Sequence, residues 1–317
     1  MSLPETLREL LTAPGPSGRE SSAAAVWQAA AREFASDVQS DLLGSSTARV
    51  AGTGAGPRLA VVGHIDEIGI MVTHIDDEGF LWFGGVGGWD PVNLVGQRVE
   101  LHTAAGEVVL GVVGKKPIHL LESEEREKAP KLKDLHIDIG AKDSGEARGR
   151  VRVGDWAVIS GEPVELAPGR FASRSMDNRL GCWIALEAAR LVAQAGGAPG
   201  EVVACAVAQE ETTFGGATTT AFTLEPDVAI VVDVTHATDA PNIDKRQEGD
   251  HGLGSGAVVN TGSVPHPLVV RLLRETAEAE GIPFAEEAAG RTTSTDADAI
   301  HLSRKGVPCG IVSIPLR

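Results

Sequence analysis

Three short apolar runs constrain the fold most, because each one leads into a residue with metal-binding or acid–base chemistry. The runs and the residues that follow them are residues 59–62 with His64, residues 202–207 with Glu210, and residues 228–232 with Asp233. Short runs of this kind are typical of strands buried on both faces of a parallel sheet. Because the carboxyl ends of parallel strands meet at one edge, we expect the three side chains to face one crevice.

Helical patterns alternate with these strands. Leu180, Trp183 and Leu186 mark one helix, residues 268–279 an amphipathic one and residues 296–304 another, before a last strand at residues 309–314. Near the start, residues 3–11 have helical spacing. Ser17 and Glu20 resemble a capping box that opens a second helix reaching residue 31. The alternation predicts an α/β fold with a largely parallel mixed sheet covered by helices.

The middle of the chain has a different sequence pattern. Between residues 68 and 166, short apolar runs such as 69–72, 99–102 and 156–159 alternate with glycine-rich turns. We interpret this stretch as a small β-rich domain inserted into the α/β domain, which would comprise residues 1–67 and 167–317. An insertion of this kind requires the two ends of the β-rich segment to lie close together.

Charge and composition exclude several classes of protein. The 28 Lys and Arg against 44 Asp and Glu give a net charge of −16, which disfavours binding to nucleic acid or to an anionic membrane. No apolar run is long enough to span a bilayer, and the polar N-terminus lacks a signal-peptide pattern. The three cysteines have no CxxC spacing. We therefore expect a soluble, cytoplasmic protein.

Six residues could carry chemistry, and each also has a plain structural explanation. A histidine after a strand is often a hydrogen-bonded structural residue, an aspartate at a helix start is often a cap, and paired glutamates can be a solvated strand end. Together, one imidazole and several carboxylates around one crevice suit two divalent metal ions that share a bridging carboxylate. The six are His64, Asp66, Asp177, Glu210, Glu211 and Asp233.

A family resemblance rests on segments that cover nearly the whole chain. Among them are GHIDEIGIMVTHIDDEGF, GGWDP, SMDNRLGC, AQEETTFGGA, VVDVTHATDAP and STDADAIHLSRKGVPCGIVSIPLR. In order and spacing, the sequence resembles the cytosolic dinuclear metallo-aminopeptidases that assemble into hollow tetrahedral particles, including the glutamyl aminopeptidases. The resemblance implies a zinc-peptidase-like catalytic domain that carries a PDZ-like or barrel-like dimerisation domain.

The resemblance also implies a role for each site residue. His64 and Asp233 would bind one metal ion, Glu211 would bind a second and Asp177 would bridge both, with a cis peptide bond following it. Glu210 would be the general base, and Asp66 would orient His64. The expected cofactors are two divalent ions per subunit, zinc or cobalt with manganese as a further option. The expected substrates are short peptides, and the expected assembly is a homododecamer built from dimers.

One departure from the family pattern leaves alternatives open. The family places a fifth ligand, a histidine, a few residues after the IPLR strand, whereas this sequence stops at Arg317. We expect a further C-terminal segment to complete the second metal site. The alternatives are a catalytically impaired, shell-forming homologue and a metal-dependent deacylase or deblocking amidohydrolase on the same site.

Overall fold

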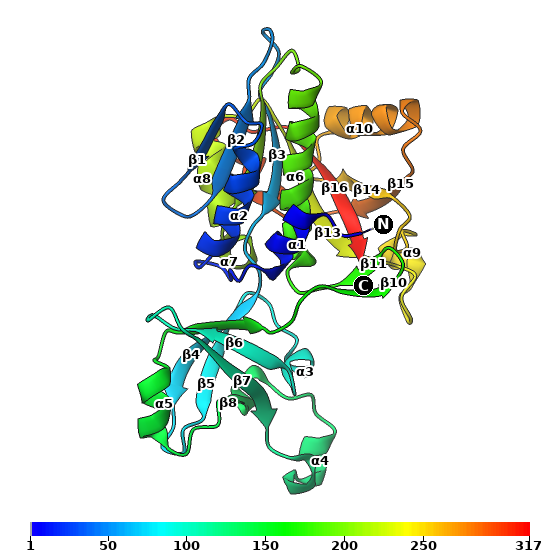
Figure 1. Cartoon of the computed structure of the whole chain (residues 1–317). Coiled ribbons are helices and arrows are strands. Elements are labelled where there is room, and N and C mark those ends of the chain that lie inside the picture. Colours follow the sequence, from blue (N-terminus) through cyan, green and yellow to red (C-terminus); the bar gives the residue numbers. More distant parts are fainter. Residues whose placement is uncertain (1) are drawn as a thin grey trace.

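The computed structural model describes residues 2–317, except for the side chain of residue 125. One of its two lobes is built on an eight-stranded mixed sheet with the order β1-β2-β12-β3-β13-β16-β14-β15 (Figure 1). Its strands are β1 (Asp37–Ser40), β2 (Ser46–Val50), β3 (Leu59–His64), β12 (Val202–Val207), β13 (Val228–His236), β14 (Ala257–Gly262), β15 (Phe284–Ala289) and β16 (Cys309–Leu316).

The centre of this sheet is parallel, as the apolar runs predict. β12, β3, β13 and β16 are parallel neighbours, while β2 and β14 pair antiparallel to the two sides of this group. Every residue of β12 is buried, because helices cover both faces of the sheet. The register aligns Val207 with His64, so the ends of β12 and β3 lie at the same edge.

Two helical layers enclose the sheet. α1, α2 and α6 pack on one face around the buried Trp27, while α8 and α11 cover the other face. The helices of this lobe are α1 (Glu5–Thr12), α2 (Ser21–Ala31), α6 (Met176–Gln194), α7 (Glu210–Thr213), α8 (Gly215–Leu224), α9 (Lys245–Glu248), α10 (Pro267–Ala279) and α11 (Ala297–Ile300). Within the described part of the chain, no helix has the length and apolar character that crossing a membrane requires.

The second lobe is a closed β-barrel with its own apolar core (Figure 1). The predicted inserted β module is thus present as a six-stranded barrel, and the fold class is confirmed. Its strands, in barrel order, are β4 (Gly69–Ile75), β5 (Leu81–Val86), β8 (Leu135–Asp138), β7 (Val108–Lys115), β6 (Arg98–His102) and β9 (Trp156–Ile159). The short helices α3 (Pro91–Leu94), α4 (Ser123–Arg126) and α5 (Ser144–Arg150) flank it, and the hairpin of β10 (Val164–Ala167) and β11 (Arg170–Ala172) leads back to α6.

Two local predictions are wrong. The capping box does not form, because α2 begins only at Ser21 and the Ser17 hydroxyl donates to Asp66 instead. The helix predicted over residues 296–304 is limited to the four residues of α11, and turns follow it. In the first case a tertiary hydrogen bond replaces the local one that the sequence motif indicates.

Gly63 allows α6 to approach β3 closely at the edge where the strands end. A methyl group at this position would lie 2.5 Å from the carbonyl carbon of Gly181 and 2.5 Å from the backbone nitrogen of Cys182. Helix and strand therefore meet backbone to backbone at this point. The contact places the first turn of α6 beside His64, the last residue of β3.

We expect Gly63→Ala to lower the free energy of unfolding by about 1–3 kcal/mol, because the added methyl group overpacks the contact with α6. Urea unfolding followed by circular dichroism would measure the change. Gly149→Ala is the matched control, since Gly149 lies exposed in α5 with nothing within 4 Å of an added methyl group. The control should be neutral or slightly stabilising. Equal stability of Gly63→Ala and the unmodified protein would contradict the close approach.

Candidate metal centre

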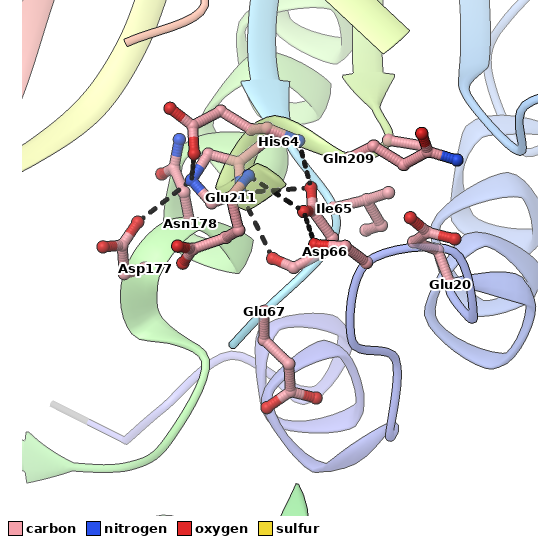
Figure 2. A network of polar contacts seen from close by, with 12 residues as sticks. Glu20, His64, Ile65, Asp66, Glu67, Asp177, Asn178, Gln209 and Glu211 are labelled. Atoms are coloured by element: carbon pink, nitrogen blue, oxygen red, sulfur yellow. Dashed lines mark hydrogen bonds and ion pairs between the residues drawn. The ribbon is translucent and has the colours of Figure 1, made fainter. Parts of the chain in front are cut away.

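One ring nitrogen of His64 faces a crevice, and the other is held by Asp66 (Figure 2). The imidazole is buried at the end of β3, with Nδ1 3.2 Å from the backbone oxygen of Asp66. Nε2 faces three carboxylates, at 3.0 Å from Asp177 Oδ1, 3.7 Å from Glu210 Oε2 and 4.0 Å from Asp233 Oδ1. A histidine held at one nitrogen in this way is oriented to bind a metal ion through the other.

Asp177 reaches His64 because the regular part of α6 begins after residue 178. The Asp177–Asn178 peptide bond is cis, as the family resemblance implies, and both residues have non-helical backbone angles. The buried Asn178 donates from Nδ2 to the carbonyl oxygen of Val232 at 2.8 Å, and its Oδ1 accepts the backbone N–H of Gly181 at 2.9 Å. The first bond attaches the start of α6 to β13, on which Asp233 lies, and the second holds the Asn178 side chain against the first turn of α6.

Asp66 organises the segment that carries the two adjacent glutamates. Its Oδ1 accepts the backbone N–H of Glu210 at 3.0 Å, and its Oδ2 accepts that of Glu211 at 3.2 Å and the Ser17 hydroxyl at 2.6 Å. Burial raises the pKa of Asp66, but hydrogen bonds from His64, Ser17 and the Glu210 backbone hold that pKa below its ordinary value. Asp66 is therefore an anion that ties His64 to the start of α7.

The other carboxyl groups of the crevice, of which Asp233 is buried and Glu210 and Glu211 are half-buried, are hard to ionise together. Burial raises the pKa of Glu210 to about 7, that of Glu211 to about 8 and that of Asp233 to about 7, and repulsion among the carboxylates adds to each shift. Burial alone would lower the pKa of His64, but hydrogen bonds to Asp177 and Asp66 raise it well above the ordinary value. Ionising all the carboxyl groups of this cluster would raise the free energy of the folded protein unless cations are bound.

The donor atoms are arranged closely enough to bind metal ions. Among the described residues, His64, Glu210 and Asp233 form one set of ligand atoms within 4.8 Å of one another, and His64, Asp177 and Glu211 form a second. Imidazole nitrogen and carboxylate oxygen suit zinc, cobalt and manganese, so the residues present fit divalent ions. The structure thus brings together all six residues predicted from the sequence. A carboxylate oxygen of Glu210 is also one of the potential metal-binding atoms.

Sequence reasoning missed the buried ionic support beneath this centre. Arg179 is fully buried and pairs with the buried Glu67 at 3.3 Å. Its guanidinium also donates to the backbone oxygens of Leu10, Ala13 and Ile65. The only sequence signal was an arginine inside an otherwise apolar helical pattern, directly after residues 177 and 178. Ser17 is a second missed support, because its motif resembled a helix cap.

Comparison with known proteins agrees with this geometry. Residues 44–317 match the sequence profile described as M42 glutamyl aminopeptidase. The chain belongs to the M42 glutamyl aminopeptidase family. The lysyl aminopeptidase of Pyrococcus furiosus is 32% identical over 322 residues, which cover 99% of this chain and 89% of that protein.

Solved structures of TET peptidases share the fold of this M42 chain. The TET aminopeptidase of a marine-sediment thaumarchaeote matches with a TM-score of 0.93 and 34% identity, over 98% of this chain and 87% of that one. The TET1 peptidase of Pyrococcus horikoshii, described as assembling into a tetrahedron or a large octahedral shell, matches with a TM-score of 0.85 and 29% identity, over 98% and 90%.

Family membership decides the class of activity. The M42 protein is a metal-dependent aminopeptidase, a hydrolase that acts on peptide bonds, so this expectation from the sequence is confirmed. The two alternatives, a deacylase and a catalytically impaired shell protein, are not favoured.

We expect metal-stripped M42 protein to lose thermal stability as the pH rises from 5 to 8. A carboxyl group whose pKa is higher in the folded than in the unfolded chain stabilises the fold fully at low pH. That stabilisation is lost as the pH rises through the folded pKa, which is about 7 for Glu210 and Asp233 and about 8 for Glu211.

Thermal unfolding at a series of pH values would measure this loss, and saturating Zn²⁺ at pH 8 should restore the melting temperature because the ion binds the folded state. Glu211→Gln should make the pH dependence shallower in the metal-stripped protein. A melting temperature that rises steadily from pH 5 to 8 without metal would contradict the raised pKa values.

Proposed function

We propose that this enzyme removes N-terminal residues from short peptides with two divalent ions, zinc or cobalt, with manganese as the further option. In this proposal His64 and Asp233 bind one ion, Glu211 binds the other and Asp177 bridges both. Support comes from the position of His64 Nε2, which lies 3.0 Å from Asp177 Oδ1 and 4.0 Å from Asp233 Oδ1. Glu211 supplies an atom to the second set of ligand atoms together with Asp177.

Divalent ions bound there would polarise the peptide carbonyl and make a water molecule more acidic. Glu210 is the proposed general base, and its Oε2 lies 3.7 Å from His64 Nε2 at the crevice. Burial raises the pKa of Glu210 to about 7, which suits a group that must both accept and return a proton near neutral pH. Its carboxylate takes the proton of the attacking water and delivers it to the nitrogen of the departing amine.

Asp66 is proposed as a positioning residue. On the side away from the crevice, His64 Nδ1 lies 3.2 Å from the backbone oxygen of Asp66 and 3.5 Å from its carboxylate Oδ1. The same carboxylate accepts the backbone N–H groups of Glu210 and Glu211. A single buried carboxylate thus sets the direction of the metal-binding imidazole and the place of the general base. Such support makes ligand orientation depend on residues that do not touch the substrate.

One observation carries the proposal: six polar residues from four separate chain segments converge where β3 and β12 end, beside Asp233 within β13. The test is amino-acid release from short peptides with free or acetylated N-termini, by metal-stripped protein with and without added Zn²⁺ or Co²⁺. We expect metal-dependent release from free N-termini only. Release from the acetylated peptides would contradict the proposal and favour the deblocking alternative.

We expect Glu210→Gln to lower kcat by about 10²–10⁴-fold, because an amide cannot accept the proton from water. Initial rates on a free dipeptide would measure the loss, and metal analysis by mass spectrometry should find unchanged metal content. Glu278→Gln, on the exposed side of α10, is the control and should keep full activity. Substantial turnover by metal-loaded Glu210→Gln would rule out Glu210 as the base.

The barrel lobe is the proposed dimerisation domain, residues 68–166, inserted between the two catalytic segments 1–67 and 167–317. Three alternating residues of β7, Val108, Leu110 and Val112, expose apolar side chains to solvent. Rows of exposed apolar side chains mark association surfaces. A second copy of the chain is the proposed partner, because the Pyrococcus horikoshii relative assembles into a tetrahedron. The homododecamer and the cytoplasmic location remain predictions of the family resemblance.

We expect Leu110→Glu to prevent dimerisation, because it places a charge in the centre of this apolar row. Light scattering coupled to size-exclusion chromatography would report the particle mass. Leu42→Glu is the control, since Leu42 is fully exposed in the turn between β1 and β2 and should leave assembly unchanged. Particles of unchanged mass for Leu110→Glu would exclude this strand from the interface.

A further inference from the structure

The cavity beside the metal centre extends beyond the residues proposed to bind ions. Its volume is about 500 Å³, within the range of small-molecule sites. The wall away from the centre, here called the far wall, is formed by Asn260 of β14, Glu287 of β15, residues 293–295 and the ends of β13 and β16. With the scissile bond held at the metal centre, the remainder of the cavity would be open to the side chain of the N-terminal residue.

Glu287 reaches the far wall from β15 and has an unpaired oxygen. Successive strand residues point to opposite faces, and the preceding Glu286 pairs with Arg274 of α10 at 2.7 Å. Glu287 Oε2 is buried and accepts no hydrogen bond from the described residues. Its partner in register, Asn260, donates its amide to Ser313 Oγ at 2.8 Å. Leaving a buried carboxylate oxygen unpaired raises the free energy of the folded protein, and binding a cationic ligand there would lower it.

The charge of Glu287 is not matched within the cavity. Neither set of metal-binding atoms among the described residues includes Glu287. The other ionised side chain on the far wall, Arg317, binds both carboxylate oxygens of Asp239, and this pairing lowers the pKa of Asp239 to about 2. The guanidinium is therefore already paired, and the far wall carries a net negative charge that faces the incoming side chain.

We propose that Glu287 is a specificity-determining residue that binds the cationic side chain of an N-terminal lysine or arginine. This inference rests on the proposed function, because it requires the first peptide bond to be held at the metal centre. The long side chains of lysine and arginine can carry their charge to the far wall while the backbone stays at that centre. An apolar side chain of similar length leaves Glu287 unpaired and is bound less well.

The test compares peptides that begin with lysine, arginine, norleucine or glutamate, cleaved by the metal-loaded enzyme. Norleucine has the carbon skeleton of lysine without its ammonium group. We expect kcat/KM to favour lysine and arginine over norleucine. Glu287→Gln should lower kcat/KM for lysine and arginine about 10- to 100-fold and leave norleucine nearly unchanged.

Glu286→Gln is the matched control, because Glu286 neighbours Glu287 on the same strand but pairs with Arg274 on the other face. This variant should keep the preference of the unmodified enzyme. Equal losses on all four peptides in Glu287→Gln would overturn the proposal, because Glu287 would then contact a part common to every substrate, such as the α-amine. An unchanged preference for lysine in Glu287→Gln would overturn it as well.

A binding measurement separates this inference from the proposed function. Isothermal titration of the metal-loaded protein should show tighter binding of free L-lysine than of L-norleucine, and Glu287→Gln should remove the difference. Selective lysine binding by a protein that cleaves no peptide would contradict the proposed function and support the role of Glu287. An active enzyme that binds the two amino acids equally would overturn the role of Glu287 alone.

Discussion

The buried guanidinium of Arg179 holds the segments on which the active centre depends. It pairs with Glu67 and binds backbone oxygens near the end of α1 and at Ile65, directly after His64. Without it, the backbone oxygen of Ile65 would lose its guanidinium donor, and the buried Glu67 would keep only Arg174 and the backbone N–H of Gly15 as partners among the described residues, which is destabilising. Because Arg179 lies two residues after Asp177 and Ile65 one residue after His64, this single cation sets the spacing of two proposed metal ligands.

The centre above this support is organised by negative charge. β3, α6, α7 and β13 each bring an imidazole or a carboxylate to one sheet edge, and burial raises the pKa of Glu210, Glu211 and Asp233. Divalent ions are the natural balance for such a group, in agreement with the metal dependence of the M42 family. Glu287 has a further carboxylate oxygen on the far wall that no described residue pairs, and there the cation that neutralises it would be the side chain of the substrate.

The main elements could be predicted from the sequence where an apolar run or a helical period marks them. The strand at residues 156–159 matches β9, and the runs that lead to His64 and Asp233 are parallel neighbours in the sheet. Prediction failed where one tertiary contact overrides a short local motif, as when the Ser17 hydroxyl bonds Asp66 rather than capping α2. The approach of His64 and Glu210 was predictable, because strand ends share an edge, although Asp233 lies inside β13 and not after it. Arg179 was not predictable, because its partners are distant in the chain.

The sequence by itself determined the α/β class and the β-rich middle of the chain, and it indicated six candidate residues for the centre, because hydrophobic periodicity and strand-end chemistry are local properties. Only the tertiary structure decided which carboxylates lie near His64 Nε2, which cation supports them and where Glu287 points. These outcomes depend on Arg179, on the close approach at Gly63 and on the alternation of Glu286 and Glu287 along β15. The first two are distances between segments far apart in the chain, and packing alone sets such distances. The alternation along β15 is local, but it directs Glu287 to the cavity only because β15 pairs with β14 in the sheet.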